Sequence, residues 1–294
     1  MKKAIFFIGA LIFPFILCNK APDNPIAQES NLNLRPGTNR CLIDFDGKMR
    51  DTYILLPSDF QRDTEYPVIF FFHGLGGVKE WGRSVLYSLL ENEDFIGISP
   101  QGVENSWNAG SGGVPSTEDD VGFALEILDL LENEANLNEN QIYSMGYSNG
   151  GAFSYRLALD SDRFAAIASL SASFFEGRSI AQNVSKTSVI HMHGDLDLVV
   201  PYNGGQSINL DIVFQSAMNT VLQWVQHNEI SETPVITNPE ENLTVYTFRE
   251  ENNPYEVILY CLEETTHHII THPIISTDRC YDEILEFFMR HSKN

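Results

Sequence analysis

Ser148 lies in a stretch whose residue types could carry a nucleophile. Residues 145–151 read MGYSNGG, which places the serine between Gly146 and Gly150. The residues before it have the apolar character of a strand, and residues 150–159 have the pattern of a helix. Glycines on both sides permit a strained strand-to-helix turn that raises the hydroxyl out of the sheet. This context predicts a nucleophile rather than a polar residue in a glycine-rich loop.

A nucleophilic serine needs a base that accepts its proton and returns it to the leaving group. The late segment ETTHHIITHP (264–273) offers three histidines after a predicted strand. We favour His267 as the base, with His268 and then His272 as alternatives. No pair of Cys or His residues lies nearby at the helical spacing of a zinc site, so we expect no metal at these histidines.

An acid that orients the base is expected after another strand. The segment HGDLDLVVPY (193–202) supplies Asp195 and Asp197. We favour Asp197 as the acid, and Asp195 is the alternative, although it could instead stabilise the turn. His191 and His193 are interpreted as packing and loop-bonding residues.

Two backbone N–H groups are candidates for stabilising an oxyanion. One belongs to Asn149, directly after the serine, and the other to Leu75 in the segment HGLGG (73–77), which follows the apolar run PVIFFF. His73 begins that segment and is interpreted as a structural loop residue, because the expected chain order is nucleophile, acid, base.

The elements that must position these residues alternate between strands and helices. This alternation predicts an α/β fold with a mostly parallel central sheet covered by helices on both faces, in which ligands bind outside the carboxyl ends of the strands. We predict helices at 117–134, 150–159, 208–227 and from 277 or 278 to 290. Predicted strands lie at 50–57, 66–74, 95–100, 141–147, 164–171 and 188–193, with a hairpin at 243–248 and 255–262.

Several motifs together resemble one family of enzymes. They are HGLGG, SWNAG (106–110), DDVGF (119–123), GYSNGGAFSYRLA (146–158), FAAIASLSAS (164–173) and HGDLDLVVPYNGG (193–205). The chain from about residue 38 to 290 is similar to the polyhydroxybutyrate depolymerase-like esterases, which are relatives of feruloyl and acetyl xylan esterases in the α/β-hydrolase superfamily. The resemblance implies a cofactor-free serine esterase and assigns the acid to Asp197. The stretch TTHHII departs from the family pattern around the base and leaves His267 and His268 both open.

The N-terminal residues read as an export signal rather than as part of the fold. Lys2 and Lys3 precede an apolar run that is short for a membrane span, and the run ends at Cys18. We therefore expect a signal peptide at 1–18, with Cys18 a possible lipid anchor as in bacterial lipoproteins. A linker at 19–37 and a single catalytic domain at 38–294 follow. The expected location is extracellular or periplasmic, tethered to the cell envelope if Cys18 is lipidated.

Composition limits the partners of the chain. The 294 residues carry a formal charge of −22, which argues against nucleic acid as a ligand. The expected partner is an ester substrate, either a plant polysaccharide ester or a polyester. Trp107 and Trp81 are candidates for stacking on such a substrate. Cys261 with Cys280 is the favoured disulfide in an exported protein, and two free buried thiols are the alternative.

The leading hypothesis is a secreted or surface-tethered serine esterase acting on polyhydroxyalkanoate, feruloyl or acetyl-polysaccharide esters. A serine peptidase of the same fold would use the same residues. A catalytically inactive polymer-binding module is the alternative from a different class.

Overall fold

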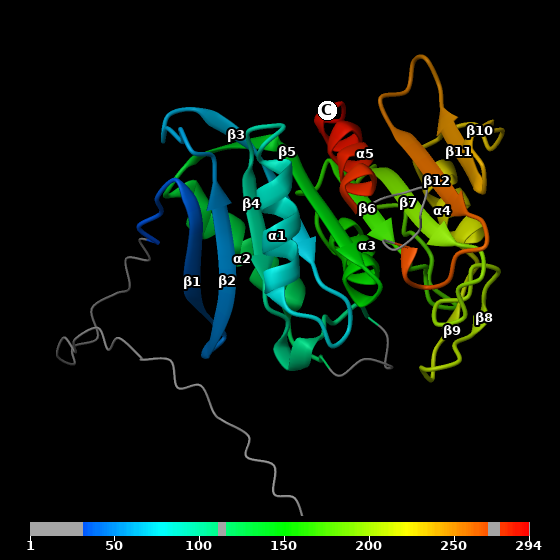
Figure 1. Cartoon of the computed structure of the whole chain (residues 1–294), viewed down its shortest axis with the longest axis horizontal. Coiled ribbons are helices and arrows are strands. Elements are labelled where there is room, and N and C mark those ends of the chain that lie inside the picture. The colour runs from blue at the N-terminus through cyan, green and yellow to red at the C-terminus, as the bar shows by residue number, and fades with distance from the viewer. Residues whose placement is uncertain (1–31, 111–115, 270–276, 294) are drawn as a thin grey trace, which may run out of the picture. The chain divides into compact units, whose positions relative to one another are not determined.

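A large twisted sheet forms the centre of the protein (Figure 1). The computed structural model describes residues 32–110, 116–269 and 277–293. In this part of the chain ten strands lie in the order β1-β2-β4-β3-β5-β6-β7-β12-β11-β10. The strands are β1 (Gly37–Phe45), β2 (Lys48–Leu56), β3 (Glu65–Phe72), β4 (Ile96–Pro100), β5 (Asn136–Tyr147), β6 (Ala166–Leu170), β7 (Ser188–Gly194), β10 (Val235–Glu240), β11 (Leu243–Arg249) and β12 (Glu256–Leu262).

The middle of the sheet is parallel and its margins are antiparallel. Strands β4, β3, β5, β6, β7 and β12 run in one direction. The pairs β1–β2, β2–β4, β11–β12 and β10–β11 are antiparallel. The parallel strands are covered on both faces, which explains their nearly continuous apolar sequence, as in the VIFFF run of β3. Because these six strands run in the same direction, their carboxyl ends meet at one edge of the sheet.

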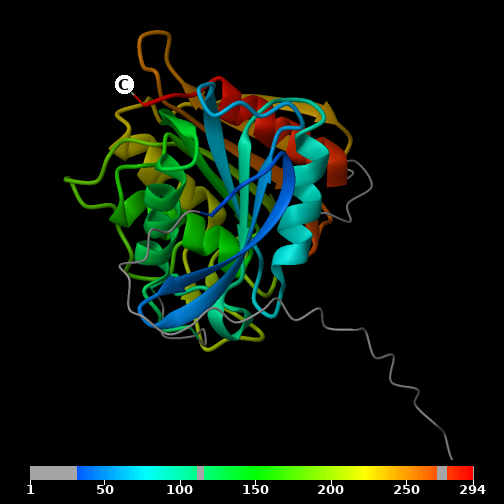
Figure 2. The same cartoon turned by 90° about the vertical axis from the view of Figure 1, so that its left-hand side faces the viewer.

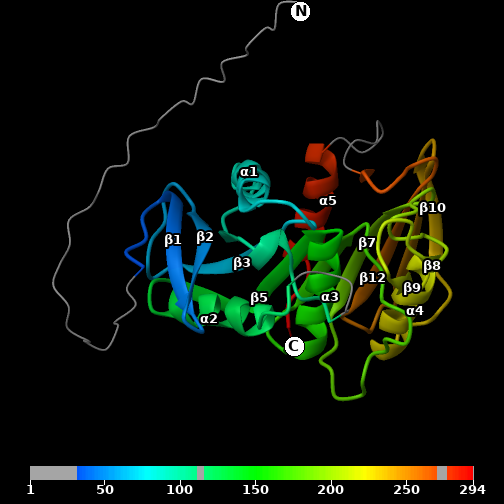
Figure 3. The ribbon, with the colours of Figure 1, turned by 90° about the horizontal axis from the view of Figure 1, so that it is seen from below.

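Helices cover both faces of the sheet (Figures 2 and 3). On one face lie α1 (Lys79–Leu89) and α5 (Thr277–Met289). On the other face lie α2 (Asp120–Glu132), α3 (Asn149–Asp160) and α4 (Ala217–His227). Each layer buries its own apolar cluster against the sheet. A small third cluster consists of Val200, Ile212 and Phe214, with Leu210 and Phe175 packed against it, and Phe175 also packs against the cluster under α2, α3 and α4.

The predicted fold class is confirmed, and one helix boundary is wrong. The helix expected from residue 208 begins only at Ala217, because the Ser216 hydroxyl accepts a hydrogen bond from Asn219 N and caps the helix there. The preceding residues instead form a two-stranded sheet of β8 (Gly205–Gln206) and β9 (Val213–Phe214). Strands β1 and β10 and helix α1 were not predicted.

The expected disulfide is also wrong. Cys261 and Cys280 are free buried thiols, as is Cys41. Cys261 shares its strand face with Val257 and Leu259, which belong to the cluster under α2, α3 and α4. Cys280 belongs to the cluster on the opposite face, where its thiol donates to Met192 Sδ at 3.3 Å. The sheet therefore separates the two sulfurs.

Some predictions lie outside the described residues. These are the signal peptide at 1–18 with Cys18, most of the linker at 19–37, and His272. Within the described ranges, the helices are too short or too polar to span a bilayer.

Candidate active site

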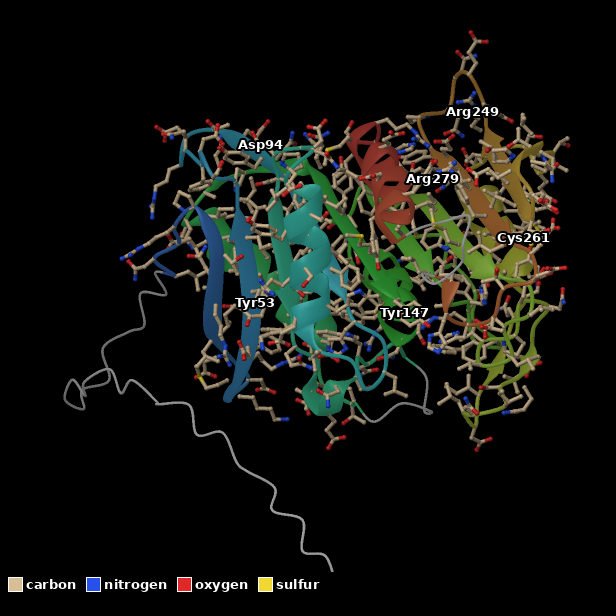
Figure 4. All side chains as sticks on the ribbon, in the orientation of Figure 1. Tyr53, Asp94, Tyr147, Arg249, Cys261 and Arg279 are labelled. Carbon is tan, nitrogen blue, oxygen red and sulfur yellow. The ribbon has the colours of Figure 1, made fainter. Side chains whose placement is uncertain are left out.

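Ser148 lies at a strained turn between β5 and α3. Its backbone angles are φ 53° and ψ −117°, a combination that L-residues rarely adopt. The turn is held on both sides, since Ser148 N donates to Leu170 O of β6 at 2.8 Å and Ser148 O accepts from Ala152 N at 2.9 Å. Figure 4 labels the preceding residue, Tyr147, at the carboxyl end of β5.

The glycines around the serine are required by close backbone approaches. A Cβ atom on Gly146 would lie 2.3 Å from the carbonyl oxygen of Gly150. A Cβ atom on Gly150 would lie 2.1 Å from the carbonyl oxygen of Phe72 in β3. Neither position has room for a side chain, so the spacing G-x-S-x-G follows from the tightness of the turn at Gly146 and from its packing against the neighbouring strand at Gly150.

His267 lies between Ser148 and Asp197. Its Nε2 atom is 2.9 Å from Ser148 Oγ, and its Nδ1 atom is 2.7 Å from Asp197 Oδ2. A carboxylate only accepts, so Nδ1 carries the proton and Nε2 is free to accept one from the serine hydroxyl. Ser148, Asp197 and His267 follow β5, β7 and β12, respectively. Ser148 lies 119 residues and Asp197 70 residues before His267 in the sequence.

The loop that carries His267 is fixed through its backbone. Two hydroxyl groups, from Tyr147 and Ser171, donate to His267 O, each at 2.9 Å. The loop also packs tightly on the end of β7, where a Cβ on Gly194 would lie 2.2 Å from Thr265 O. These contacts hold the imidazole in place without using its ring nitrogens.

In the described structure, the carboxylate of Asp197 accepts hydrogen bonds from two backbone N–H groups and two imidazole rings. Oδ1 accepts from the backbone N–H groups of Val199 at 2.8 Å and Val200 at 2.9 Å. Oδ2 accepts from His267 Nδ1 and from His193 Nε2, the latter at 3.1 Å. Burial acts to raise the pKa of Asp197, but the hydrogen bonds from the two histidines outweigh it and hold the pKa well below its usual range. The carboxylate is therefore ionised at neutral pH.

The alternative acid and base lie in other environments. Asp195 is partly exposed, and its Oδ1 accepts from Thr265 N at 3.3 Å, so it ties the two loops together. His268 is exposed, and its Nδ1 lies 3.1 Å from the hydroxyl of Tyr147. The geometry thus brings Asp197 and His267, and neither alternative, into line with the serine.

Leu75 and Asn149 lie beside Ser148 in the same cavity wall. The loop of Leu75 is held by Gly76 N donating to Asn105 O at 2.8 Å and by Gly77 N donating to Gly74 O at 2.9 Å. Among the described residues, neither Leu75 N–H nor Asn149 N–H has a hydrogen-bond partner. Asn149 lies at the N-terminus of α3, where the helix dipole favours negative charge. Both N–H groups are thus available to an oxyanion.

The side chain of Asn149 is used structurally. Its Oδ1 accepts from Trp107 N at 2.7 Å, and its Nδ2 donates to Trp107 O at 2.9 Å. This double hydrogen bond joins α3 to the loop after β4. It fixes the residue whose backbone N–H faces the candidate oxyanion site.

His73 is a buried structural residue, as its sequence position indicated. Gly102 N donates to its Nε2 at 3.1 Å, which places the ring proton on Nδ1, where it is donated to Gly74 O at 2.8 Å. Burial, the largest cause, lowers its pKa. A neutral His73 thereby links the loop of Leu75 to the end of β4.

Trp107 does not have the open ring face that stacking on a substrate requires. It is 0% exposed, packs on Phe72 and Phe153, and donates from Nε1 to His73 O at 3.0 Å. Trp81 lies on α1 with its ring against Tyr147. Neither tryptophan is among the described residues that line the cavity. Trp107 is therefore corrected to a packing residue that supports the site, whereas stacking by Trp81, which is partly exposed outside this cavity, stays a prediction.

The loop of Trp107 is anchored by a buried carboxylate that sequence reasoning did not assign. Asp120 accepts from Arg50 Nη2 at 2.8 Å, from Asn108 N at 2.8 Å and from Ser116 Oγ at 2.9 Å. It is 0% exposed and begins α2. The motif DDVGF therefore serves the site indirectly, by tying α2 to the loop that holds Asn149.

A cavity of about 320 Å³ opens beside Ser148. Ser148, His267, His268, Leu75 and Asn149 lie on its polar side. Its apolar lining comes from the segments between β6 and α4, with side chains from Ala172, Phe175, Val199, Val200, Leu210, Ile212 and Phe214. This size and lining suit a small, largely apolar group. In the described residues, no cluster of His, Cys, Asp and Glu suitable for a metal ion is present.

A serine turn, an aligned histidine and a buried aspartate at the carboxyl edge of a mostly parallel sheet define the class of α/β-hydrolases. The chain belongs to the phospholipase/carboxylesterase family, whose sequence profile matches residues 60–232. That match includes Ser148 and Asp197 and ends before His267.

The predicted resemblance to feruloyl and acetyl xylan esterases is confirmed. Feruloyl esterase B of Piromyces equi is 25% identical over 212 residues, which are 67% of this chain and 39% of that protein. A probable feruloyl esterase C of Aspergillus terreus is 26% identical over 189 residues, 61% of this chain and 66% of that protein. The solved acetyl xylan esterase of Aspergillus awamori has the same fold, with a TM-score of 0.59 at 14% identity over 86% of this chain and 99% of that one. The chain thus spans less than two thirds of the length of these two sequence relatives.

Proposed function

We propose that the protein is a serine esterase that hydrolyses carboxylic esters through an acyl-enzyme, with Ser148 as nucleophile, His267 as base and Asp197 as acid. The observation that carries the proposal is the alignment of these three side chains, at 2.9 and 2.7 Å, beside the apolar cavity. The family and the esterase relatives support the same chemistry.

The proposed reaction has two halves. Ser148 Oγ attacks the ester carbonyl carbon while its proton passes to His267 Nε2, and the resulting oxyanion accepts hydrogen bonds from Leu75 N–H and Asn149 N–H. Asp197 stabilises the imidazolium, which then protonates the departing alcohol. Water attacks the acyl-enzyme with His267 again accepting the proton. The free acid leaves and Ser148 recovers its hydrogen.

The cavity supports an apolar acyl group as the part of the substrate bound next to Ser148. Its wall carries two aromatic rings, Phe175 and Phe214, together with aliphatic side chains. We infer that it takes an aromatic acyl group such as that of feruloyl esters, in keeping with the names of the relatives. Acetyl-polysaccharide and polyhydroxyalkanoate esters are the competing substrates.

The cellular location is proposed from the sequence alone. The basic and apolar N-terminal residues support export to the periplasm or the exterior, and Cys18 supports a lipid anchor. A surface location would bring the enzyme to polymeric esters that cannot enter the cell.

The first experiment compares p-nitrophenyl acetate hydrolysis by the mature chain and by Ser148→Ala. Turnover in the wild type that disappears in the variant, together with labelling of Ser148 by a phosphonate probe, is the expected result. Methyl ferulate and acetylated xylan then separate the substrate classes, and a peptide p-nitroanilide tests the peptidase alternative. A folded wild type that binds polysaccharide but neither turns over nor becomes labelled would favour the inactive binding module.

A further inference from the structure

A second imidazole lies against the carboxylate of Asp197. His193 Nε2 is 3.1 Å from Asp197 Oδ2 and 2.9 Å from the carbonyl oxygen of Val200. A carbonyl oxygen only accepts, so Nε2 carries the proton and donates it to both oxygens. The same oxygen of Asp197 also accepts from His267. Two imidazole N–H groups thus share one carboxylate oxygen.

The hydrogen bonds continue from His193 into the core. His193 Nδ1 lies 2.9 Å from His191 Nε2, and His191 Nδ1 lies 2.6 Å from the hydroxyl of Tyr155. With neutral rings, each donor meets an acceptor: Tyr155 donates to His191, which donates to His193, which donates to Asp197. Burial, the larger cause, and the neighbouring His193 lower the pKa of His191 well below its usual value, in agreement with a neutral ring.

Packing alone does not account for this arrangement. His191 and His193 are each 0% exposed and lie on one face of β7, with ring centroids 5.2 Å apart. Burying two imidazoles costs free energy that apolar side chains of similar size would avoid, unless every ring nitrogen is hydrogen-bonded. Here all four ring nitrogens have partners, and the chain of hydrogen bonds ends on the oxygen that faces His267.

We propose that His193 is a positioning residue that fixes the Asp197 carboxylate and draws negative charge away from Oδ2, so that His267 remains neutral to lower pH. His191 and Tyr155 fix the tautomer of His193 by supplying a donor to its Nδ1. This inference rests on the proposed function, since it assigns His267 as the base.

Other groups that face this network come from several elements and do not contact Asp197 Oδ2 in the described structure. Asp195 bonds to Thr265 N, the hydroxyl of Tyr147 bonds to His267 O, and the ring of Tyr202 packs on His193. The titratable groups concerned are Tyr147 from β5, Asp195 and Tyr202 from the loop after β7, Cys261 from β12, and His268 from the loop of the base.

The test is the pH profile of kcat/KM for p-nitrophenyl acetate in His193→Leu and His193→Gln. Without the donor, Asp197 stabilises the His267 imidazolium more strongly, so the acidic limb of the His193→Leu profile moves up by about half to one pH unit. Glutamine can place an N–H near the position of Nε2 and is expected to restore the wild-type limb. Tyr155→Phe, which releases the tautomer but keeps both imidazoles, is expected to move the limb in the same direction by a smaller amount.

His291→Leu is the matched control. His291 is a buried histidine that follows α5, its Nδ1 lies 2.7 Å from Phe287 O, and its carbonyl oxygen accepts from the hydroxyl of Tyr143 in β5. The His291→Leu substitution should lower thermal stability and leave the acidic limb of the pH profile unchanged. An unshifted limb in His193→Leu, or an equal shift in His291→Leu, would overturn the inference. If His193→Leu does not fold, an unshifted limb in Tyr155→Phe overturns it.

The experiments distinguish a failure of the proposed role of His193 from a failure of the proposed esterase function. Loss of all turnover in Ser148→Ala, with no change of pH profile in the His193 variants, would retain the esterase and reject the role of His193. Turnover that survives in Ser148→Ala would reject the esterase mechanism itself, and with it the assignment of His267 on which this inference rests.

Discussion

Replacing Asp197 by asparagine tests the proposed acid most directly. The carboxylate accepts from two backbone N–H groups on Oδ1 and from two imidazole N–H groups on Oδ2. An amide has one accepting end, which the fixed N–H groups of Val199 and Val200 would claim. The NH2 group would then face His193 and His267, and His267 would have to present an unprotonated Nδ1.

The magnitude follows from this forced change of tautomer. With its proton on Nε2, His267 no longer accepts from Ser148, and kcat is expected to fall by about 10³–10⁴-fold, as in other triads with the same substitution. The NH2 group would also point at the N–H of His193, so that two donors face each other. Water cannot replace the lost bond there, because the Asp197 side chain is 0% exposed. Exchanging such charge-assisted hydrogen bonds should cost about 3 kcal/mol of stability.

The assay is p-nitrophenyl acetate turnover, with the concentration of competent sites counted by phosphonate titration and folding checked by thermal unfolding. Asp195→Asn is the matched control, because an amide oxygen can still accept from Thr265 N. It should retain activity within about threefold, as expected for a partly exposed residue outside the reaction. A loss of 100-fold or more in Asp195→Asn, with Asp197→Asn active, would refute the assignment.

The same variant has a pH signature. The folded pKa of Asp197 lies well below its usual value, because hydrogen bonds from His193 and His267 outweigh the opposing effect of burial. The unfolded carboxyl titrates near about pH 3.9. Its contribution to stability is therefore complete above about pH 5 and is lost as the pH falls toward the folded pKa. The difference in Tm between wild type and Asp197→Asn should shrink as the pH falls from 6 to 3, and a constant difference would contradict this.

The remaining predictions concern the turn, the loop of the base and the cavity wall. Gly150→Ala places a Cβ 2.1 Å from a carbonyl oxygen of β3 and should lower stability by at least about 3 kcal/mol; a Tm within 2 °C of the wild type, read by calorimetry, would contradict the rigid packing of the turn. Tyr147→Phe removes the donor to His267 O and should lower kcat by about 5- to 20-fold with little change in KM, as the loop of the base loosens; an unchanged kcat would show that Ser171 suffices. Ile212→Phe narrows the cavity and should lower kcat/KM for p-nitrophenyl butyrate relative to acetate by about tenfold, whereas an unchanged ratio would place the acyl group elsewhere.

The sequence predicted the fold class, and local signals pointed to Ser148 and Asp197, two of the side chains that the structure aligns. A buried strand that runs into G-x-S-x-G and a helix identifies the turn at Ser148. The segment HGDLD places its carboxylates after a strand. The tight turn explains the glycine at 146, whose Cβ would meet the backbone of Gly150, and the packing against β3 explains the glycine at 150. The residue pattern of strand, turn and helix is local, so the sequence records it even though one of its causes is a contact with a distant strand.

The choice between His267 and His268 depends on tertiary contacts instead. The two residues are adjacent, and their orientation is decided by hydroxyl groups of Tyr147 and Ser171 that meet the carbonyl of His267. These donors lie 120 and 96 residues away in sequence. No local pattern could have distinguished the two imidazoles.

The contact of His193 with Asp197 has a signal in the sequence, but His191 and His193 are interpreted there as packing and loop-bonding residues. His191 and His193 alternate along one strand and so share a face, and Asp197 follows four residues later. Helix α1 was missed because it begins after Val78, which provides no side-chain cap, and because Gly82 interrupts its pattern. That glycine is explained only by tertiary packing, since a Cβ there would lie 2.3 Å from Ser99 Oγ.

Much of the apolar wall of the cavity belongs to the small cluster of Val200, Ile212 and Phe214, which meets the cluster under α2, α3 and α4 through Phe175. Substitutions in a cluster that shares few neighbours with the main core should add to its energetics nearly independently. In the proposed esterase, substrate preference could therefore change in evolution or by directed mutagenesis while the sheet and the serine turn keep their stability. The side chains proposed to select the substrate and those proposed to carry out the chemistry are held by largely different sets of contacts.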